Sequence, residues 1–180
     1  MSTLEILPAD LSSAAATFTD PDAIARALDA VGVGFERWQA SAPLTPDASS
    51  EQILAAYADP IARLSARHGF QSVDVVRMHP EHPARAEARR KFLAEHTHAD
   101  FEVRFFVEGR GRFYLHIGDQ VFLMTCEAGD LLSVPSGTRH WFDMGERPLF
   151  TAIRLFTTPE GWVASFTGDD IATHFPELAT

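Results

Sequence analysis

The second half of the chain alternates between short apolar runs and clusters of turn residues, a spacing typical of β-strands. After Glu102 the side chains are branched or aromatic, as a strand prefers. Turn signals rich in glycine, proline and aspartate interrupt the apolar runs at residues 108–111, 117–120, 126–130, 135–138 and 145–148. The first two of these signals predict hairpins. Strands at this spacing predict a closed sandwich or barrel from about residue 95 onward.

The first half of the chain combines helical periods with short extended segments. Residues 20–21 supply an acidic N-cap followed by proline, and residues 49–52 have the character of a capping box. Pro60 should break or kink the helix that starts there, and Gly69 should end it. A charged helix is expected over residues 84–93. The remaining expectations are strands at 3–7, 33–39 and 71–78 and a loop marked by Pro43 and Pro46.

These patterns predict one mainly β domain over residues 1–180, a length sufficient for a single hydrophobic core. Residues 1–94 would supply helices and edge strands packed outside, and residues 95–166 would form the β-barrel core. The sequence contains no internal repeat, low-complexity segment or sign of a second domain.

Side chains with metal-binding chemistry gather where the barrel region begins. His96, His98 and Glu102 stand at even spacing, so an unbroken strand would present all three on one face. Arg104 continues the same parity. On a helix the two histidines would diverge, because residues two apart do not face each other there. The segment is therefore interpreted as half of a metal site on a single strand.

A later segment supplies another histidine. His140 follows the turn at residues 135–138 and begins a strand over residues 140–144. Three neutral imidazoles and one carboxylate suit Fe, Ni, Mn, Co, Zn or Cu better than Mg or Ca. The competing interpretation is that these are surface or core histidines. Two histidine-containing segments with defined spacing, both in a β-region rich in glycine turns, favour the metal site.

The charge of the chain narrows its range of partners. The formal net charge is −10 and the pI is about 5.1, which argues against nucleic acid or an anionic membrane because phosphate binding needs clustered lysine and arginine. The same charge would repel an anionic substrate, so a metal and one or two arginines would have to hold it. The basic residues of 84–93 are interpreted as a solvated helix face. A single cysteine, Cys126, and the absence of a signal-peptide pattern or membrane-length apolar run predict a cytoplasmic protein, and few exposed apolar runs favour a monomer.

The two histidine segments resemble the paired motifs of the cupins. The matching positions are His96, His98, Glu102 and Gly109 in the first motif and Gly129, Pro135, Gly137 and His140 in the second. Met144 departs from the family, whose second motif usually ends in asparagine at a position that is not a metal ligand. The resemblance implies a cupin fold, a double-stranded β-helix or jelly-roll barrel, with the N-terminal helices packed outside.

The wider sequence resembles the bacterial acireductone dioxygenases of methionine salvage, from Glu51 to Trp162 and most strongly in residues 91–98, 102–105 and 137–145. This resemblance implies one Fe(II) or Ni(II) ion per chain, and it implies that the acireductone 1,2-dihydroxy-5-(methylthio)pent-1-en-3-one reacts with O2. The implied products with Fe(II) are formate and 4-methylthio-2-oxobutanoate. With Ni(II) they are formate, carbon monoxide and 3-methylthiopropanoate. The implied ligands are His96, His98, Glu102 and His140.

Other residues are assigned roles around this site. Arg104 shares the face of Glu102 and is predicted to be catalytic, because its guanidinium can lie beside bound oxyanions. For Arg154, inside an apolar strand, a structural carboxylate and the substrate both remain open as partners. The predicted slot for the methylthio tail is lined by Phe92, Phe142, Phe156 and Trp162, although each of these is also a plausible core residue. Glu95 and Phe101 flank the ligands, and the resemblance implies roles in metal loading or in relaying movement.

Two other kinds of function fit a cupin. One is a different metal-dependent enzyme, an isomerase or a dioxygenase of a thiol or flavonol. The other is a cupin that only binds a ligand, as a storage or sensory module, because fold does not determine function. Arg104 and the aromatic lining favour an enzyme, and the N-terminal helices lack the basic character of a DNA-binding sensor domain. The sequence therefore predicts a metal-dependent dioxygenase.

Overall fold

The computed structural model describes residues 1–40, 42, 44–45 and 47–178, so Pro43 and Pro46, expected in a loop, lie outside the described residues. The strands of the N-terminal half are β1 (Thr3–Pro8), β2 (Ala16–Phe18), β3 (Gly34–Arg37) and β4 (Ser72–Met78). The later strands are β5 (His96–Thr97), β6 (Glu102–Ile117), β7 (Gln120–Glu127), β8 (Asp130–Val134), β9 (Arg139–Asp143), β10 (Phe150–Phe156) and β11 (Ser165–Phe166). The helices are α1 (Pro21–Asp29), α2 (Ser50–Ala56), α3 (Ala58–His68) and α4 (Arg85–Leu93), with a 3₁₀ turn η1 (Ile171–His174).

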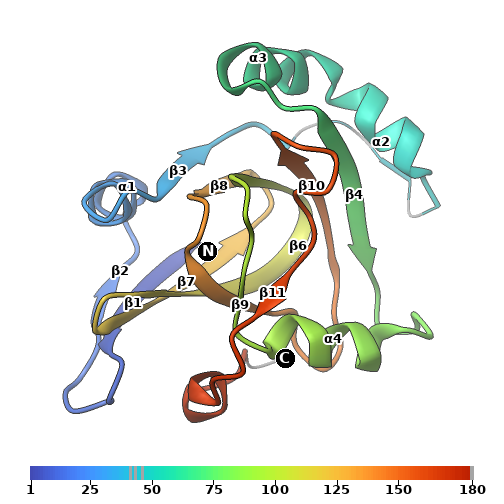
Figure 1. The fold of residues 1–180 in the computed structure, drawn as a ribbon. Coiled ribbons are helices and arrows are strands. Elements are labelled where there is room, and N and C mark those ends of the chain that lie inside the picture. The colour runs from blue at the N-terminus through green and yellow to red at the C-terminus, as the bar shows by residue number, and fades with distance from the viewer. Residues whose placement is uncertain (41, 43, 46, 179–180) are drawn as a thin grey trace.

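The strands form a double-stranded β-helix, the cupin fold, in which β6 belongs to both sheets (Figure 1). The first half of β6 pairs with β8 and β10, and the second half pairs with β7 and β9. One sheet therefore has the order β4-β10-β6-β8-β3, and the other runs β11-β5-β9-β6-β7-β1-β2. All these pairings are antiparallel.

The hairpin predicted at residues 108–111 is wrong, because β6 continues through this segment. Gly109 has φ 70°, and the register between β10 and β6 shifts between Thr151 and Ala152. Glycine at a positive φ is typical of a bulge, which bends a strand without ending it. The chain here passes from one sheet into the other. The turns predicted at residues 117–120, 126–130, 135–138 and 145–148 all separate strands as expected.

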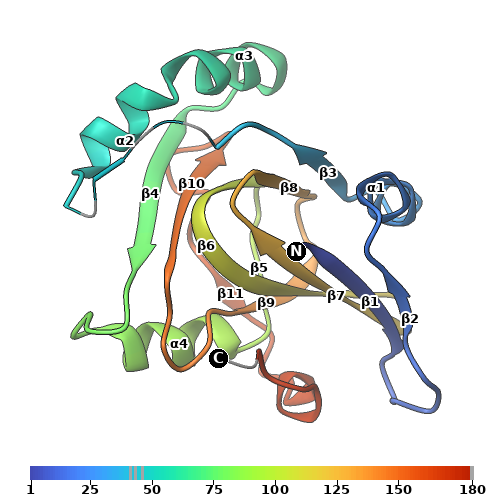
Figure 2. The same cartoon turned by 180° about the vertical axis from the view of Figure 1, so that it is seen from behind.

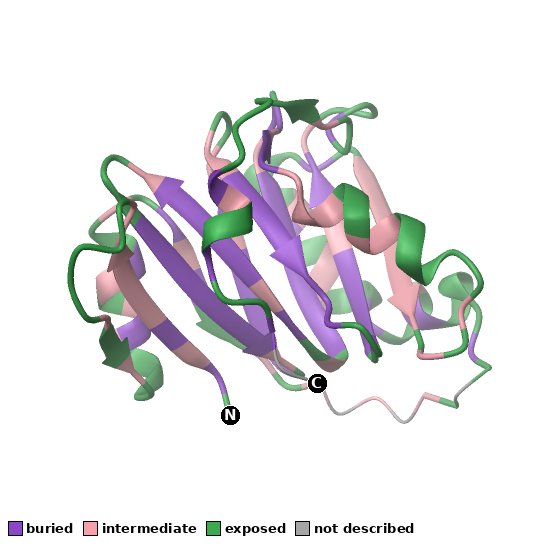
Figure 3. Ribbon diagram, turned by 90° about the horizontal axis from the view of Figure 1, so that it is seen from below, coloured by how far each residue is buried: buried purple, intermediate pink, exposed green. Residues whose placement is uncertain are grey.

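The barrel interior is an apolar core built from both sheets. Its largest buried side chains are aromatic and aliphatic residues that face each other across the barrel, among them Phe106, Phe113, Leu115, Phe142 and Phe150. Burying such side chains stabilises the fold by about 1.5–3 kcal/mol each. The barrel strands are mostly buried, whereas the helices are mostly exposed (Figure 3).

The N-terminal helices lie outside the barrel, as predicted (Figures 1 and 2). Ile53, Tyr57 and Leu64 of the α2–α3 region pack in one cluster with Val103 and Ile153 of β6 and β10. The capping predictions are confirmed: the Asp20 side chain caps α1, and Ser49 and Gln52 form a capping box on α2. The second helix breaks at Tyr57, three residues before Pro60, and Gly69 ends α3 at φ 74°. Among the described residues, no helix combines the length and apolar character needed to cross a bilayer.

Replacing Gly109 with alanine should destabilise the fold more than the same change at Gly118. Both glycines have positive φ, 70° and 63°, which costs an alanine about 1–2 kcal/mol. A Cβ on Gly109 would also lie 1.8 Å from the carbonyl oxygen of Leu149, whereas one on Gly118 would meet nothing within 4 Å. We expect urea unfolding to give a loss of about 1–2 kcal/mol for Gly118→Ala and at least about twice that for Gly109→Ala. Equal losses would contradict the proposed crossing at Gly109.

Candidate metal centre

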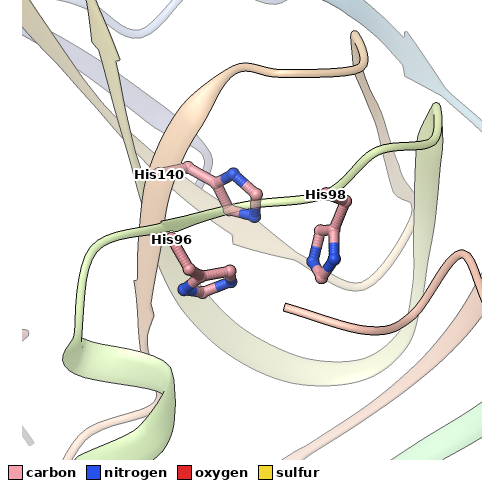
Figure 4. A group of neighbouring side chains, drawn as sticks. All are labelled: His96, His98 and His140. Carbon is pink, nitrogen blue, oxygen red and sulfur yellow. The ribbon is translucent and has the colours of Figure 1, made fainter. Parts of the chain in front are cut away.

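The imidazoles of His96, His98 and His140 converge at one end of the barrel (Figure 4). His96 and His140 are directly opposite each other in the β5–β9 pairing. The unbroken strand expected over residues 96–102 is wrong, since β5 ends at Thr97 and β6 starts at Glu102. A bend, rather than strand parity, brings His98 to the other two imidazoles. The three histidines therefore converge as predicted. Even spacing on one strand, however, does not explain how His98 reaches the other two.

Each imidazole is oriented by a main-chain carbonyl. The Nδ1 atom of His96 lies 2.7 Å from the oxygen of Ala94, that of His98 3.0 Å from Val163, and that of His140 2.8 Å from Thr138. A carbonyl accepts only, so each Nδ1 carries the proton and each Nε2 presents a lone pair. One ligand nitrogen from each ring can be chosen so that all three lie within 4.8 Å of one another. This is the arrangement by which proteins orient histidine ligands toward a metal.

The electrostatics of the site favour the neutral imidazoles that a metal requires. Burial, reinforced by the adjacent imidazole of His140, lowers the pKa of His96 from its ordinary value to about 4. Burial also lowers the pKa of His98, more strongly than the neighbouring Glu102 carboxylate raises it. At neutral pH these two histidines are therefore free to donate lone pairs.

Glu102 supplies a carboxylate beside the three rings. Its side chain is 1% exposed, and its Oε1 accepts a hydrogen bond of 2.6 Å from Arg104. Burial alone would raise the pKa of Glu102, but the charge of Arg104 and the contact with His140 hold it well below its usual range. The Oε2 atom lies 3.4 Å from Nε2 of His98 and 3.6 Å from Nε2 of His140, yet it has no hydrogen-bond partner in the structure. A buried, unpartnered carboxylate oxygen beside the ring nitrogens of His98 and His140 fits a cation.

A cavity of about 450 Å³ is lined by His96, His98 and His140 but not by Glu102. Five residues predicted at the site besides the histidines line it: Phe92, Arg104, Phe142, Arg154 and Trp162. The guanidinium of Arg104 lies 4.6 Å from the ring centre of Phe113 and 4.9 Å from that of Phe142. Phe156 is fully buried and does not line the cavity. It lies behind His98, with the ring centres 5.8 Å apart.

Arg154 has the structural partner that the sequence left open. Its Nε and Nη2 donate to the two carboxylate oxygens of Asp74 at 2.9 and 2.6 Å. Asp74 is directly opposite Arg154 in the β4–β10 pairing. The guanidinium still borders the cavity. Arg154 therefore combines a structural ion pair with a place on the cavity wall.

Glu95 and Phe101 lie outside the cavity lining. The buried carboxylate of Glu95 contacts Nδ1 of His116 at 2.6 Å and accepts a 2.6 Å hydrogen bond from Thr167. The ring of Phe101 stacks on that of Phe70, with centres 6.0 Å apart. Both residues thus brace the segments around the ligands.

Sequence reasoning missed several residues of the cavity wall: Val76, Lys91, Phe113, Val163, Ala164 and Phe166. Phe113 could have been inferred from pairing, because it is directly opposite Phe142. Residues 163–166 carry no periodic signal. They follow the loop after β10 and, next to the predicted Trp162, bring the roughly half-exposed side chains of Val163 and Phe166 to the cavity.

The double-stranded β-helix and the converging histidines define a metal-binding cupin. The sequence model of the ARD/ARD' family matches residues 11–164, and the chain belongs to that family.

Relatives of known name agree with this assignment. An acireductone dioxygenase of Methylococcus capsulatus is 60% identical over 178 residues, which is 99% of this chain and 96% of the relative. One from Aquifex aeolicus is 60% identical over 159 residues, 88% of this chain and 87% of the relative. The solved acireductone dioxygenase from Bacillus anthracis, with a cadmium ion in its active centre, is 33% identical with a TM-score of 0.81 and covers 92% of this chain and 98% of that one. The chain is therefore an enzyme of the dioxygenase class.

Replacing His140 with alanine should weaken the binding of a divalent ion such as Ni²⁺ by more than about 100-fold, beyond the effect of residues that only orient ligands. The loss is expected because one of three converging lone pairs is removed. Competition with a chelator measures the affinity. His79→Ala is the matched control, since His79 is exposed and lies outside the centre. Similar affinities in the two variants would refute the site.

The metal-free protein should lose stability as the pH falls below about 6.5. The unfolded chain protonates His96 near its ordinary pKa of 6.5, while the folded chain does so only at about 4. The unfolded state therefore binds more protons in this window, and the free energy of unfolding declines by up to about 3 kcal/mol as the pH approaches 4. Urea unfolding at several pH values checks this. His96→Asn should flatten the dependence, and an unchanged profile in that variant would contradict the assignment.

Proposed function

We propose that this enzyme cleaves the acireductone 1,2-dihydroxy-5-(methylthio)pent-1-en-3-one with O2; its relatives are named acireductone dioxygenases. The observation that supports this most directly is the convergence of three imidazoles on the wall of a largely apolar cavity, with the unpartnered Oε2 of Glu102 beside His98 and His140. A polar end that can hold a chelated enediol and an apolar slot for a thioether are what this substrate requires.

The residues that would hold the metal are His96, His98, Glu102 and His140, and the donor set suits Fe(II) or Ni(II), one ion per chain. When bound, such an ion supplies a Lewis acid and a template for two substrate oxygens. Oε1 of Glu102 accepts the hydrogen bond from Arg104, and Oε2, which faces His98, would bind the metal. The cadmium ion of the Bacillus anthracis relative supports a cation at the equivalent centre.

Arg104 would stabilise the anionic form of the substrate. Its Nη2 donates to Glu102, while its Nε is buried and has no hydrogen-bond partner in the structure. A buried guanidinium with an unused donor at the cavity wall can bind a substrate oxyanion. The rings of Phe113 and Phe142 under the guanidinium restrict its movement.

The apolar wall would accept the methylthio tail. Phe92, Phe142 and Trp162 line the cavity together with Val76, and contacts between sulfur and aromatic rings are favourable. Phe156 contributes from behind, by supporting His98. In this proposal the side chains of the cavity wall, and not the metal ligands, recognise the methylthio tail.

The overall reaction inserts both atoms of O2 into the organic products. Fe(II) would give formate and 4-methylthio-2-oxobutanoate. Ni(II) would give formate, carbon monoxide and 3-methylthiopropanoate. Each product set accounts for all atoms of the acireductone and O2. We propose that residues 1–180 work as one cytoplasmic cupin domain and as a monomer.

The test is an oxygen-consumption assay in which metal-free protein is reloaded anaerobically with Fe(II) or Ni(II), given the acireductone, and then exposed to O2. Consumption of one O2 per acireductone, with carbon monoxide released only by the nickel form, supports the proposal. No consumption by either form would refute it, and would favour an isomerase or a binding protein.

Arg104→Ala should lower kcat by about 100-fold or more, the typical loss when one oxyanion donor is removed. The metal content should stay near one ion per chain, because the imidazoles keep their carbonyl partners. Metal analysis and oxygen uptake on the same sample measure both quantities. Loss of the metal along with activity would show instead that Arg104 is structural.

A further inference from the structure

Helix α4 contains no fully buried side chain. Its partly buried apolar side chains pack against the core, and charged side chains add further contacts. The sequence interpretation of its charges as a solvated face is confirmed for Glu87 and Lys91, which are exposed and form an ion pair of 3.6 Å. It is wrong for Arg89, whose side chain is only 16% exposed.

Arg89 pairs with a fully buried carboxylate on the strand that carries His140. Its Nε lies 2.9 Å from Oδ1 of Asp143, and its Nη2 lies 3.2 Å from Oδ2. The main-chain N–H groups of Gly145 and Leu178 donate to the same carboxylate at 2.8 Å each. A two-point contact of this kind restricts orientation as well as distance. The Nη2 of Arg89 also donates to Glu177, at 2.7 Å.

This ion pair lies next to the wall of the cavity. Phe92 is three residues after Arg89, on the same side of the helix, and its ring meets that of Phe142 edge-on with centres 6.1 Å apart. Phe142 directly precedes Asp143, so the aromatic contact and the ion pair join the same two elements at adjacent positions. Figure 2 shows α4 beside β9, the strand that it contacts.

We propose that Arg89, through Asp143, is a positioning residue that sets how the cavity receives the substrate's tail. The pair holds α4 against β9 and so keeps Phe92 at its distance from Phe142. This inference rests on the proposed function, and it extends that function to a residue that neither touches the substrate nor lines the cavity.

The metal centre should be insensitive to this contact. The rings of His96 and His140 are oriented by the carbonyls of Ala94 and Thr138, and their strands pair directly. Loosening α4 should therefore alter recognition of the tail more than metal binding or the chemistry at the enediol. That separation distinguishes a positioning residue from a merely structural one.

The experiment compares Arg89→Gln with Arg90→Gln, which removes the same charge from the neighbouring, exposed position of the helix. Each variant and the wild type are assayed with the acireductone and with an analogue that lacks the methylthio group. For Arg89→Gln we expect KM for the acireductone to rise by about tenfold, a typical effect of a loosened apolar contact. KM for the analogue, kcat and metal content should change by less than about twofold. Arg90→Gln should match the wild type.

Arg89→Lys serves as a second variant that keeps the charge but loses the two-point contact. It should show a smaller shift in the same direction, and it carries the test if Arg89→Gln does not fold. Equal KM changes for both substrates, or a loss of metal from either Arg89 variant, would overturn the inference. A wild type that consumes no oxygen with either substrate would refute the proposed function, and this inference with it. An active wild type with equal shifts would refute this inference alone.

Discussion

The contact on which the site depends is the buried ion pair between Glu102 and Arg104. The two side chains are 1% and 6% exposed, respectively, and an unpaired charge in such a place would cost several kcal/mol. The pair is neutral as a whole and uses only one oxygen of the carboxylate. The lowered pKa values of His96 and His98 mean that these two imidazoles add no charge to the pair at neutral pH. In the proposed function, the two positive charges of a divalent ion would be balanced by a dianionic substrate. In that proposal, this local balance is what would let a chain with a net charge of −10 accept an anion.

The three imidazoles owe their direction to the main chain rather than to other side chains. Two of the carbonyls come from two residues before the histidine that they orient, and the third comes from Val163, far along the sequence. Main-chain partners cannot be removed by changing one side chain, so this orientation is robust to substitution. The segment of Val163 also supplies the cavity wall. The same stretch of chain thus contributes both to ligand orientation and to the shape of the slot.

Much of the fold was predictable because its signals are local. Helix caps, proline breaks and left-handed glycines depend on a few neighbouring residues, and the predictions from them hold at Asp20, Ser49 and Gly69. The segment around Gly109 shows the limit of that reasoning. A glycine at positive φ serves a hairpin and a bulge equally well, and only the strands that pair on either side decide between them. Here β6 finds partners in both sheets and does not turn back.

The sequence by itself determined the family to which the chain belongs, and it predicted the residues of the candidate site: three histidines, a carboxylate and an arginine beside it. Only the tertiary structure decided how these residues meet. It showed that a bend brings His98 to the other imidazoles. It also showed that Arg154 pairs with Asp74, and that Arg89 pairs with Asp143, although 80 and 54 residues separate the partners. The physical reason is that residue types and their local spacing can be read directly from the sequence. A contact between distant segments depends instead on the path of the whole chain, which no short stretch encodes.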